Sequence, residues 1–295
     1  MLIKPGTIQH TEYDWQFETI PQPGLFENGT EGAQPVPRGK VIGGTSAMNW
    51  MIHNTDSRVQ LDIWESLLGL DGWNWETLST AFRESETMYA PPNATAQYFK
   101  YNPAVHGGTG PIDSIFQRSV LSLFPDYVEP TLLNAGYKIP ADRNGGNAVG
   151  AGFLPLAIAP ENYTRSYSGS AYTAAQSRSN LHLIHNARVA GIEWSSTANG
   201  SATASGLRYV NTLDNSSNAT RHLSAREVII SSGCVQSSQV LELSGVGDPS
   251  ILQPLGIDVV VDNANVGKYS SLSLVAALAD LIRRHRSPRS AHDGM

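Results

Sequence analysis

The sequence predicts an α/β fold that is α+β overall, and three kinds of segment lead to this prediction. Apolar residues recur at helical spacing in 74–85, and they alternate with other residues in 189–194 and 204–210, as is typical of strands. An unbroken apolar run within 227–231 is typical of a buried strand, and it turns at Gly233 into a further helical stretch. Strand, glycine turn and helix in this order form one half of a nucleotide-binding unit.

The helices can be assigned in chain order from their caps. Prolines before residue 39 argue against a long helix there, so the first helix is expected after Gly43-Gly44, with Thr45 or Ser46 as its N-cap. Asn74 can cap a helix that starts after it, and Gly136 can end a later one. The predicted helices are 47–52, 62–68, 74–85, 121–135, 168–177 and the stretch after Gly233.

The strands are short and are bounded by turn residues. The predicted strands are 112–115, 153–159, 181–184, 189–194, 204–210, 227–231 and a last one within 252–261. Those from 181 to 210 follow one another closely, and we expect them to form a meander. No internal repeat is visible.

Composition excludes several classes of protein. The 295 residues, of which 40% are hydrophobic, can bury the core of one large domain or of two modest ones. A net charge of -6 with scattered basic residues argues against a nucleic acid partner. Cys234 is the single cysteine, so an internal disulfide and a thiolate zinc site are excluded. No segment approaches the length of a membrane span, so no membrane partner is expected.

Six N-glycosylation sequons favour secretion of the parent protein and make it a candidate glycoprotein. The segment from Met1 to His10 has no apolar core of the length that a signal peptide needs, so the localisation of the chain itself stays open. The sequon asparagines are Asn28, Asn93, Asn162, Asn199, Asn215 and Asn218.

Two long segments carry a resemblance to a known family. Residues 37–49, PRGKVIGGTSAMN, and residues 232–247, SGCVQSSQVLELSGVG, resemble the first and second signatures of the glucose-methanol-choline (GMC) FAD-dependent oxidoreductases. Between and around them, GWNW at 72–75, HGGTGP at 106–111 and PLGI at 254–257 resemble further landmarks in the family order. The similarity covers most of 13–267.

The resemblance implies an incomplete, Rossmann-like FAD-binding domain joined to part of a GMC substrate domain. The family begins with a βαβ unit whose G-x-G-x-x-G loop binds the pyrophosphate, and this motif is not found in the sequence. We therefore expect 1–267 to be the FAD-binding region without its first βαβ unit, so that the chain is a fragment. Residues 268–295 are expected to be an unrelated basic tail, either a gene-model artefact or an amphipathic surface helix over 272–282.

The resemblance also implies the cofactor site. Gly43 and Gly44 let the backbone approach a flat ring or a phosphate closely, and Thr45 and Asn49 can offer hydrogen bonds. A lone double glycine is more often just a turn, so the surrounding signature carries this interpretation. The family positions that run beside the flavin or meet the adenine are matched here by Trp50, Met51, Ile52 and Val189.

The same resemblance implies how FAD is held and what the protein does. Some relatives attach FAD covalently through a histidine where Met48 stands, so the expected FAD is non-covalent. The implied function is oxidation of CH-OH donors, either small alcohols or sugars, as an oxidase or dehydrogenase. No residue matches the family's histidine base, so no catalytic residue is assigned and activity of the chain alone is not expected. The alternative is a non-catalytic remnant that does not retain FAD.

Metal sites are not expected from the histidines. His182 and His185 have a spacing that suggests a metal pair, but three residues apart on a strand they would face opposite ways. His106 lies in a predicted turn, and we interpret it as a loop residue. Cys234 is interpreted as a small buried residue rather than a nucleophile.

Overall fold

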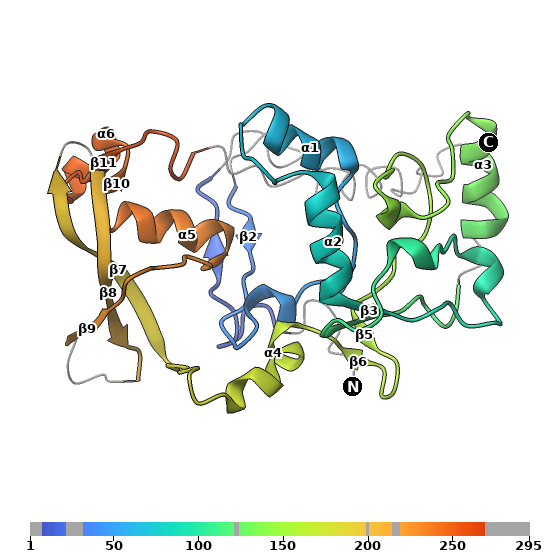
Figure 1. Ribbon diagram of the computed structural model, residues 1–295, viewed down its shortest axis with the longest axis horizontal. Helices are drawn as coiled ribbons and strands as arrows, with labels where there is room; N and C mark the ends of the chain where they lie inside the picture. Colours follow the sequence, from blue (N-terminus) through green and yellow to red (C-terminus); the bar gives the residue numbers. More distant parts are fainter. Residues whose placement is uncertain (1–7, 22–31, 121–123, 199–200, 214–218, 269–295) are drawn as a thin grey trace, which may run out of the picture. The chain divides into compact units, whose positions relative to one another are not determined.

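The computed structural model describes residues 8–21, 32–120, 124–198, 201–213 and 219–268. The chain forms two compact units, Met1–His182 and Leu183–Met295 (Figure 1). The predicted tail and the sequons at Asn28, Asn199, Asn215 and Asn218 lie outside the described residues. The other two sequon asparagines, Asn93 and Asn162, are both exposed.

The first unit combines short helices with small two-stranded sheets. Its α-helices are α1 (Arg58–Ser66), α2 (Trp75–Ser85), α3 (Glu129–Asn134) and α4 (Ser168–Ala171). Its strands are β1 (Phe17–Glu18), β2 (Pro35–Val36), β3 (Glu86–Met88), β4 (Ile112–Ser114), β5 (Ile158–Ala159) and β6 (Thr164–Arg165). The pair β3 and β4 is parallel, whereas β1 with β2 and β5 with β6 are antiparallel.

Single helical turns fill the connections of this unit. They are η1 (Gly44–Ala47), η2 (Ala96–Tyr98), η3 (Pro103–Val105), η4 (Phe124–Val128), η5 (Arg143–Gly145) and η6 (Thr173–Ser177). Of these, η4 has π-helical hydrogen bonding and the other five are 3₁₀ turns.

Side-chain caps explain where α1 and α2 begin. Ser57 and Gln60 form a capping box at the start of α1, which satisfies backbone groups that the first turn leaves unpaired. The side chain of Asn74 accepts from the backbone N–H of Thr77, so the predicted cap of α2 is confirmed. The chain then leaves α2 directly into β3 (Figure 1), and β3 begins at Glu86, which is buried.

Two apolar clusters form the core of the first unit. One consists of Met51, Ile115 and Ile158. The other consists of Met88, Phe99 and Phe116, whose two phenylalanine rings stack with centroids 4.6 Å apart. Because Met51 belongs to the first cluster, the loop that contains it is attached to this core.

The second unit is an antiparallel sheet with a helix packed on it. Strands β7 (Ala187–Ala198), β8 (Ser201–Asn211) and β9 (Thr220–Ser224) pair in that order. Helix α5 (Gly233–Glu242) packs against β7 (Figure 1). Buried Ser244 follows this helix, and its hydroxyl accepts from the Ile192 N–H at 2.7 Å. The remaining elements are β10 (Val246–Gly247), α6 (Pro249–Leu252), η7 (Gln253–Leu255) and β11 (Val261–Asp262), with β10 parallel to β11.

Several predicted boundaries are wrong. Segment 47–52 is not a helix: η1 ends at Ala47, and Met51 has a positive φ of 63°, which a helix cannot contain. Segment 168–177 divides into α4 and η6, and the described part of 121–135 divides into η4 and α3. The end of α3 before Gly136, whose φ is 84°, agrees with the prediction.

Two predicted strands, 181–184 and 227–231, are also not strands. Leu181, Leu183 and Ile184 are exposed, and so is Ile229 at 82%, whereas Val228 and Ile230 are half-buried. The unbroken apolar run in 227–231 is typical of a central parallel strand, which needs hydrogen-bonded neighbours on both sides. No described strand pairs with either segment, and β9 forms the third strand of the meander instead. None of the described helices is both long and apolar enough to cross a bilayer.

Candidate functional site

The backbone of a glycine-containing loop defines the candidate site. We call residues 43–51 the glycine loop. Gly43 and Gly44 both have positive φ, 92° and 53°, and they lead into η1. A β-carbon on Gly43 would lie 2.7 Å from the Tyr167 ring, and one on Gly39 would lie 2.2 Å from the carbonyl oxygen of Gly44. Glycine is therefore required at 39 and 43 by close packing.

The other side of the loop is open and apolar. A β-carbon on Gly44 would meet no atom within 4 Å. Trp50 is 70% exposed and Ile52 is 54% exposed, although large apolar side chains are normally covered. The Gly44 backbone and these side chains are therefore accessible to a flat, largely apolar group.

Side chains from 164–171 hold the glycine loop. The hydroxyls of Ser46 and Ser168 lie 2.9 Å apart, and Ser168 also donates to the Gly43 carbonyl at 3.2 Å. Nη1 of Arg165 donates to Asn49 Oδ1 at 2.7 Å and to the Ser46 carbonyl at 3.2 Å. Arg165 and Ser168 were not predicted as site residues, since nothing in the local sequence pattern shows that they contact a segment more than a hundred residues away.

The predicted site residues are divided between the two units. Gly43, Gly44, Thr45, Asn49 and Trp50 lie together in the glycine loop, and Ile52 directly follows it. The Met51 side chain is buried in the core, so its backbone is what the loop presents. Val189 lies on β7 of the second unit, paired with Tyr209.

Replacing Gly43 with alanine tests the packing of the glycine loop. Alanine strains a backbone with φ of 92° and clashes with the Tyr167 ring, so the free energy of unfolding should fall by about 2 kcal/mol. Urea titration would measure this change. Gly44→Ala is the matched control: it has the same sign of φ but open space around the new methyl group, so a smaller loss is expected. Equal losses would show that the Tyr167 contact is unimportant.

A buried charged cluster lies in the same unit. The two ring nitrogens of His106 donate to Glu86 Oε1 at 2.9 Å and to Asp142 Oδ2 at 3.0 Å. His53, two residues beyond the glycine loop, lies 3.1 Å from Glu86 Oε2. His106 was expected to be a loop residue, and it does follow η3, but the sequence did not indicate this buried ion-paired position.

Burial and ion pairing act in opposite directions on this cluster. Burial alone would lower the pKa of His106, but the hydrogen bonds to Asp142 and Glu86 outweigh it and raise the pKa to about 9. Burial would raise the pKa of Glu86, but the hydrogen bonds from His106 and His53 hold that pKa at about 2. At neutral pH the cluster therefore contains an imidazolium between two carboxylates.

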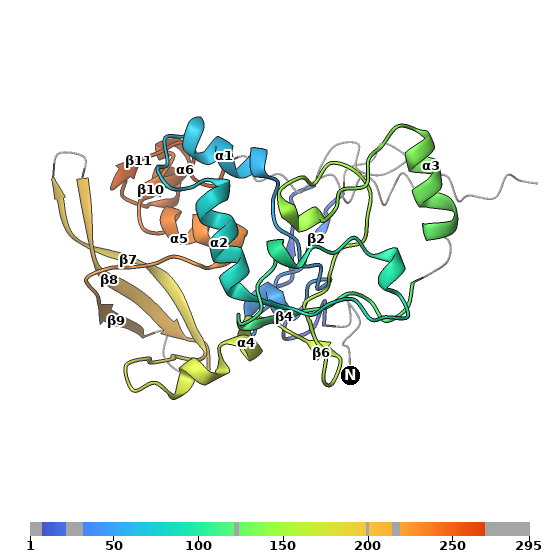
Figure 2. The same ribbon diagram turned by 45° about the vertical axis from the view of Figure 1, so that its right-hand side comes forward.

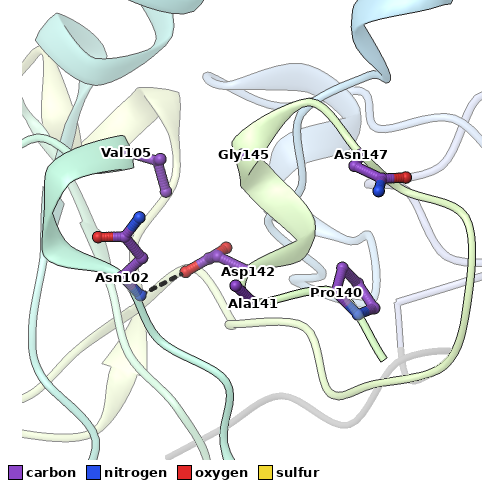
Figure 3. A pocket seen from close by; sticks show the side chains of 7 residues that line it. All are labelled: Asn102, Val105, Pro140, Ala141, Asp142, Gly145 and Asn147. Carbon is purple, nitrogen blue, oxygen red and sulfur yellow. Dashed lines mark hydrogen bonds between the residues drawn. The ribbon is translucent and has the colours of Figure 1, made fainter. Parts of the chain in front are cut away.

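A pocket of about 230 Å³ adjoins this cluster at Asp142 (Figure 3). Asp142 is the one charged residue among the described residues that line it, and its carboxylate already accepts from His106 and from the Asn102 N–H at 3.0 Å. We assign no ligand to this pocket. The described residues contain no group of three or more His, Cys, Asp or Glu side chains that could hold a metal ion. The lining residues are Asn102, Val105, Pro140, Ala141, Asp142, Gly145 and Asn147.

Comparison with known families finds one match. Residues 22–268 match the family model described as GMC oxidoreductase. A GMC oxidoreductase family protein of Malassezia sympodialis is 34% identical over 263 residues, which are 88% of this chain and 41% of that protein. Dehydrogenase mpl7 of Monascus purpureus is 36% identical over 278 residues, covering 90% of this chain and 41% of that protein.

Solved structures give the same result for the fold. An FAD-dependent oxidoreductase from Chaetomium thermophilum matches with a TM-score of 0.75 at 26% identity, over 86% of this chain and 42% of that one. A fungal aryl-alcohol oxidase matches with a TM-score of 0.73 at 27% identity, over the same shares. The chain thus spans about two fifths of the length of the relatives it matches.

Proposed function

The chain belongs to the GMC oxidoreductase family, and from this premise we propose that it binds FAD non-covalently as part of an oxidoreductase acting on CH-OH donors. The mixed helix and strand fold agrees with a partial Rossmann-like FAD-binding domain of this family. The observation that carries the proposal is the glycine loop: Gly43 is packed against the Tyr167 ring, whereas the space around Gly44 is open and the Trp50 side chain is exposed.

The residues present fit a flavin. A flat ring system needs an exposed, mainly apolar surface with backbone and amide groups at its edge, and Trp50, Ile52 and Asn49 offer this combination. FAD would supply the hydride acceptor. The chain's own residues would hold the ring and exclude water from the Gly44 side. Met48 is 7% exposed and its thioether cannot form the histidyl link known in the family, which supports non-covalent binding.

Family membership supports a class of substrate, donors with a CH-OH group, rather than one compound. Relatives with matching sequence or fold include an oxygen-dependent choline dehydrogenase of Burkholderia thailandensis, 30% identical over 88% of this chain, and the aryl-alcohol oxidase. We propose a small-molecule alcohol or sugar as the donor. No residue of the chain matches the family's histidine base, so we assign no catalytic residue and propose that the chain alone does not turn over alcohols.

A second candidate is a non-catalytic remnant that does not retain FAD. The exposed apolar segments 181–184 and 227–231 favour it, because a sheet that lacks their neighbours leaves apolar surface in water. Such a chain would keep the family signatures while failing to order the cofactor site. Secretion of the parent protein, supported by exposed Asn93 and Asn162, is compatible with both candidates.

FAD titration distinguishes the two candidates. The purified chain is mixed with FAD, and the visible spectrum and flavin fluorescence are followed. We expect a shifted, structured flavin band and quenched fluorescence, and we expect all of the flavin in the supernatant after acid precipitation, since the link is non-covalent. The same chain unfolded in urea is the control. An unchanged FAD spectrum would favour the remnant, and flavin in the acid pellet would contradict non-covalent binding.

A further inference from the structure

We propose that Arg165 and Ser168 are positioning residues that hold the glycine loop in the conformation that receives FAD. This inference rests on the proposed function, and it adds two residues that the family signatures do not include. The contacts come from β6 and from the start of α4, which lies beside η1 (Figure 2).

Ser168 adds contacts from outside the loop to the double glycine, where the Ser46 hydroxyl already donates to the Gly43 carbonyl. The Ser168 hydroxyl donates to the Gly43 carbonyl at 3.2 Å, and Ser46 Oγ accepts from the Ser168 N–H at 3.3 Å. The two hydroxyls also lie 2.9 Å apart. Glycine can adopt many backbone conformations. A side chain that binds the Gly43 carbonyl, which lies between Gly43 and Gly44, therefore restricts the backbone conformations of both residues.

Arg165 acts at the other end of the loop. One guanidinium nitrogen bonds both the Ser46 carbonyl, at 3.2 Å, and Asn49 Oδ1, at 2.7 Å. The same Asn49 oxygen accepts from the Met51 N–H at 2.9 Å. Arg165 therefore fixes the orientation of the Asn49 amide, whose oxygen is used internally and whose NH₂ group is the part left for a ligand.

The rest of the loop depends on these contacts. The backbone hydrogen bonds donated by Gly44, Ser46, Met48 and Asn49 all end within residues 41–45. Such local bonds shape single turns but do not attach them to a core. Attachment comes from the buried side chains of Met48 and Met51, from the Tyr167 ring on Gly43, and from the side chains of Arg165 and Ser168.

The charge of Arg165 also suits the cofactor. Burial lowers the pKa of its guanidinium, and no carboxylate among the described residues pairs with it. FAD carries a pyrophosphate and gains negative charge when its ring is reduced. An uncompensated cation bonded to the loop therefore favours FAD over an uncharged ring of the same shape.

Three variants and two controls test the proposal. Ser168→Ala removes the carbonyl contact, Arg165→Met removes the charge and both hydrogen bonds, and Arg165→Lys keeps the charge. Ser177→Ala is the control for Ser168, since the exposed Ser177 hydroxyl donates to the Ala174 carbonyl of its own turn and lies away from the loop in sequence. Arg118→Met is the control for Arg165, since Arg118 bonds the Pro160 carbonyl and lies over the Tyr163 ring without touching the loop.

Two readouts are measured on the full chain. Amide hydrogen exchange over residues 43–51 without FAD should become about tenfold faster in Ser168→Ala and Arg165→Met, the change expected when one or two hydrogen bonds are lost. The dissociation constant for FAD should rise by about tenfold or more in the same variants. Arg165→Lys should recover part of the affinity, and both controls should stay within about twofold of the parent chain in both readouts.

The outcomes separate this proposal from the proposed function. If the parent chain binds no FAD, the proposed function fails, and the exchange readout alone decides whether the two side chains hold the loop. If FAD binds and both variants keep the parent affinity, the positioning role is overturned. It is also overturned if exchange accelerates throughout the first unit rather than over 43–51, because the residues would then stabilise the fold in general.

Discussion

Replacing Glu86 with glutamine should lower the free energy of unfolding of the first unit by about 3 kcal/mol, since it breaks a buried ion network while keeping its volume. Glu86 is 4% exposed, and its two oxygens face His106 and His53. The variant leaves the His106 imidazolium with Asp142 as its only carboxylate partner among the described residues. Desolvation of that cation is then compensated by one charge instead of two.

Urea unfolding followed by tryptophan fluorescence would measure this loss. Most tryptophans lie in the first unit, so the signal reports mainly on it; they are Trp15, Trp50, Trp64, Trp73 and Trp75, with Trp194 in the second unit. Glu84→Gln is the matched control, because Glu84 is exposed and two residues away on α2, and it should change stability by less than about 0.5 kcal/mol. Equal effects of the two variants would show that the cluster contributes no stability.

The sequence correctly predicted those helices and strands whose caps and hydrogen-bond partners lie nearby in the chain. Helix α2 has its own cap at Asn74, β7 and β8 pair with each other across a short connection, and α5 begins at Gly233 as expected. The prediction for 181–184 was wrong because β9 takes its place in the meander. The prediction for 227–231 was wrong because it depends on distant partners. An apolar run becomes a parallel strand only when distant strands supply its hydrogen bonds, and no described strand supplies them here.

The candidate site was predictable in part for a similar reason. The family signature identified the glycine loop. Its Gly43 packs so closely against Tyr167 that a residue with a β-carbon would not fit, so the sequence there has to keep glycine. Arg165, Ser168 and Glu86 were missed, since their roles depend on contacts between segments far apart in the chain. His53, which lies just beyond the glycine loop in the sequence, pairs with buried Glu86 and so connects the loop segment to this cluster.

The buried cluster should also make the stability of the first unit depend on pH. The His106 pKa is about 9 in the folded chain, against an ordinary 6.5, so its contribution is fully present below pH 6.5 and is lost as the pH rises through 9. The Glu86 pKa is about 2, against an ordinary 4.5, so its contribution is present above pH 4.5 and is lost as the pH falls through 2. Stability from the cluster is therefore greatest between about pH 4.5 and 6.5.

The alkaline limb is the part of this profile to measure. Between pH 6.5 and 9 the unfolded chain releases the His106 proton while the folded chain keeps it, so the free energy of unfolding should fall by about 3 kcal/mol. Urea titrations at half-unit steps of pH would follow the fall. His106→Gln cannot titrate, so its profile should be nearly flat over this range, whereas His222→Gln, which alters an exposed histidine of the second unit, should retain the fall. A parent chain whose stability stays constant from pH 6.5 to 9 would mean that His106 is not held as a cation, and only one of its two ring nitrogens could then donate to a carboxylate.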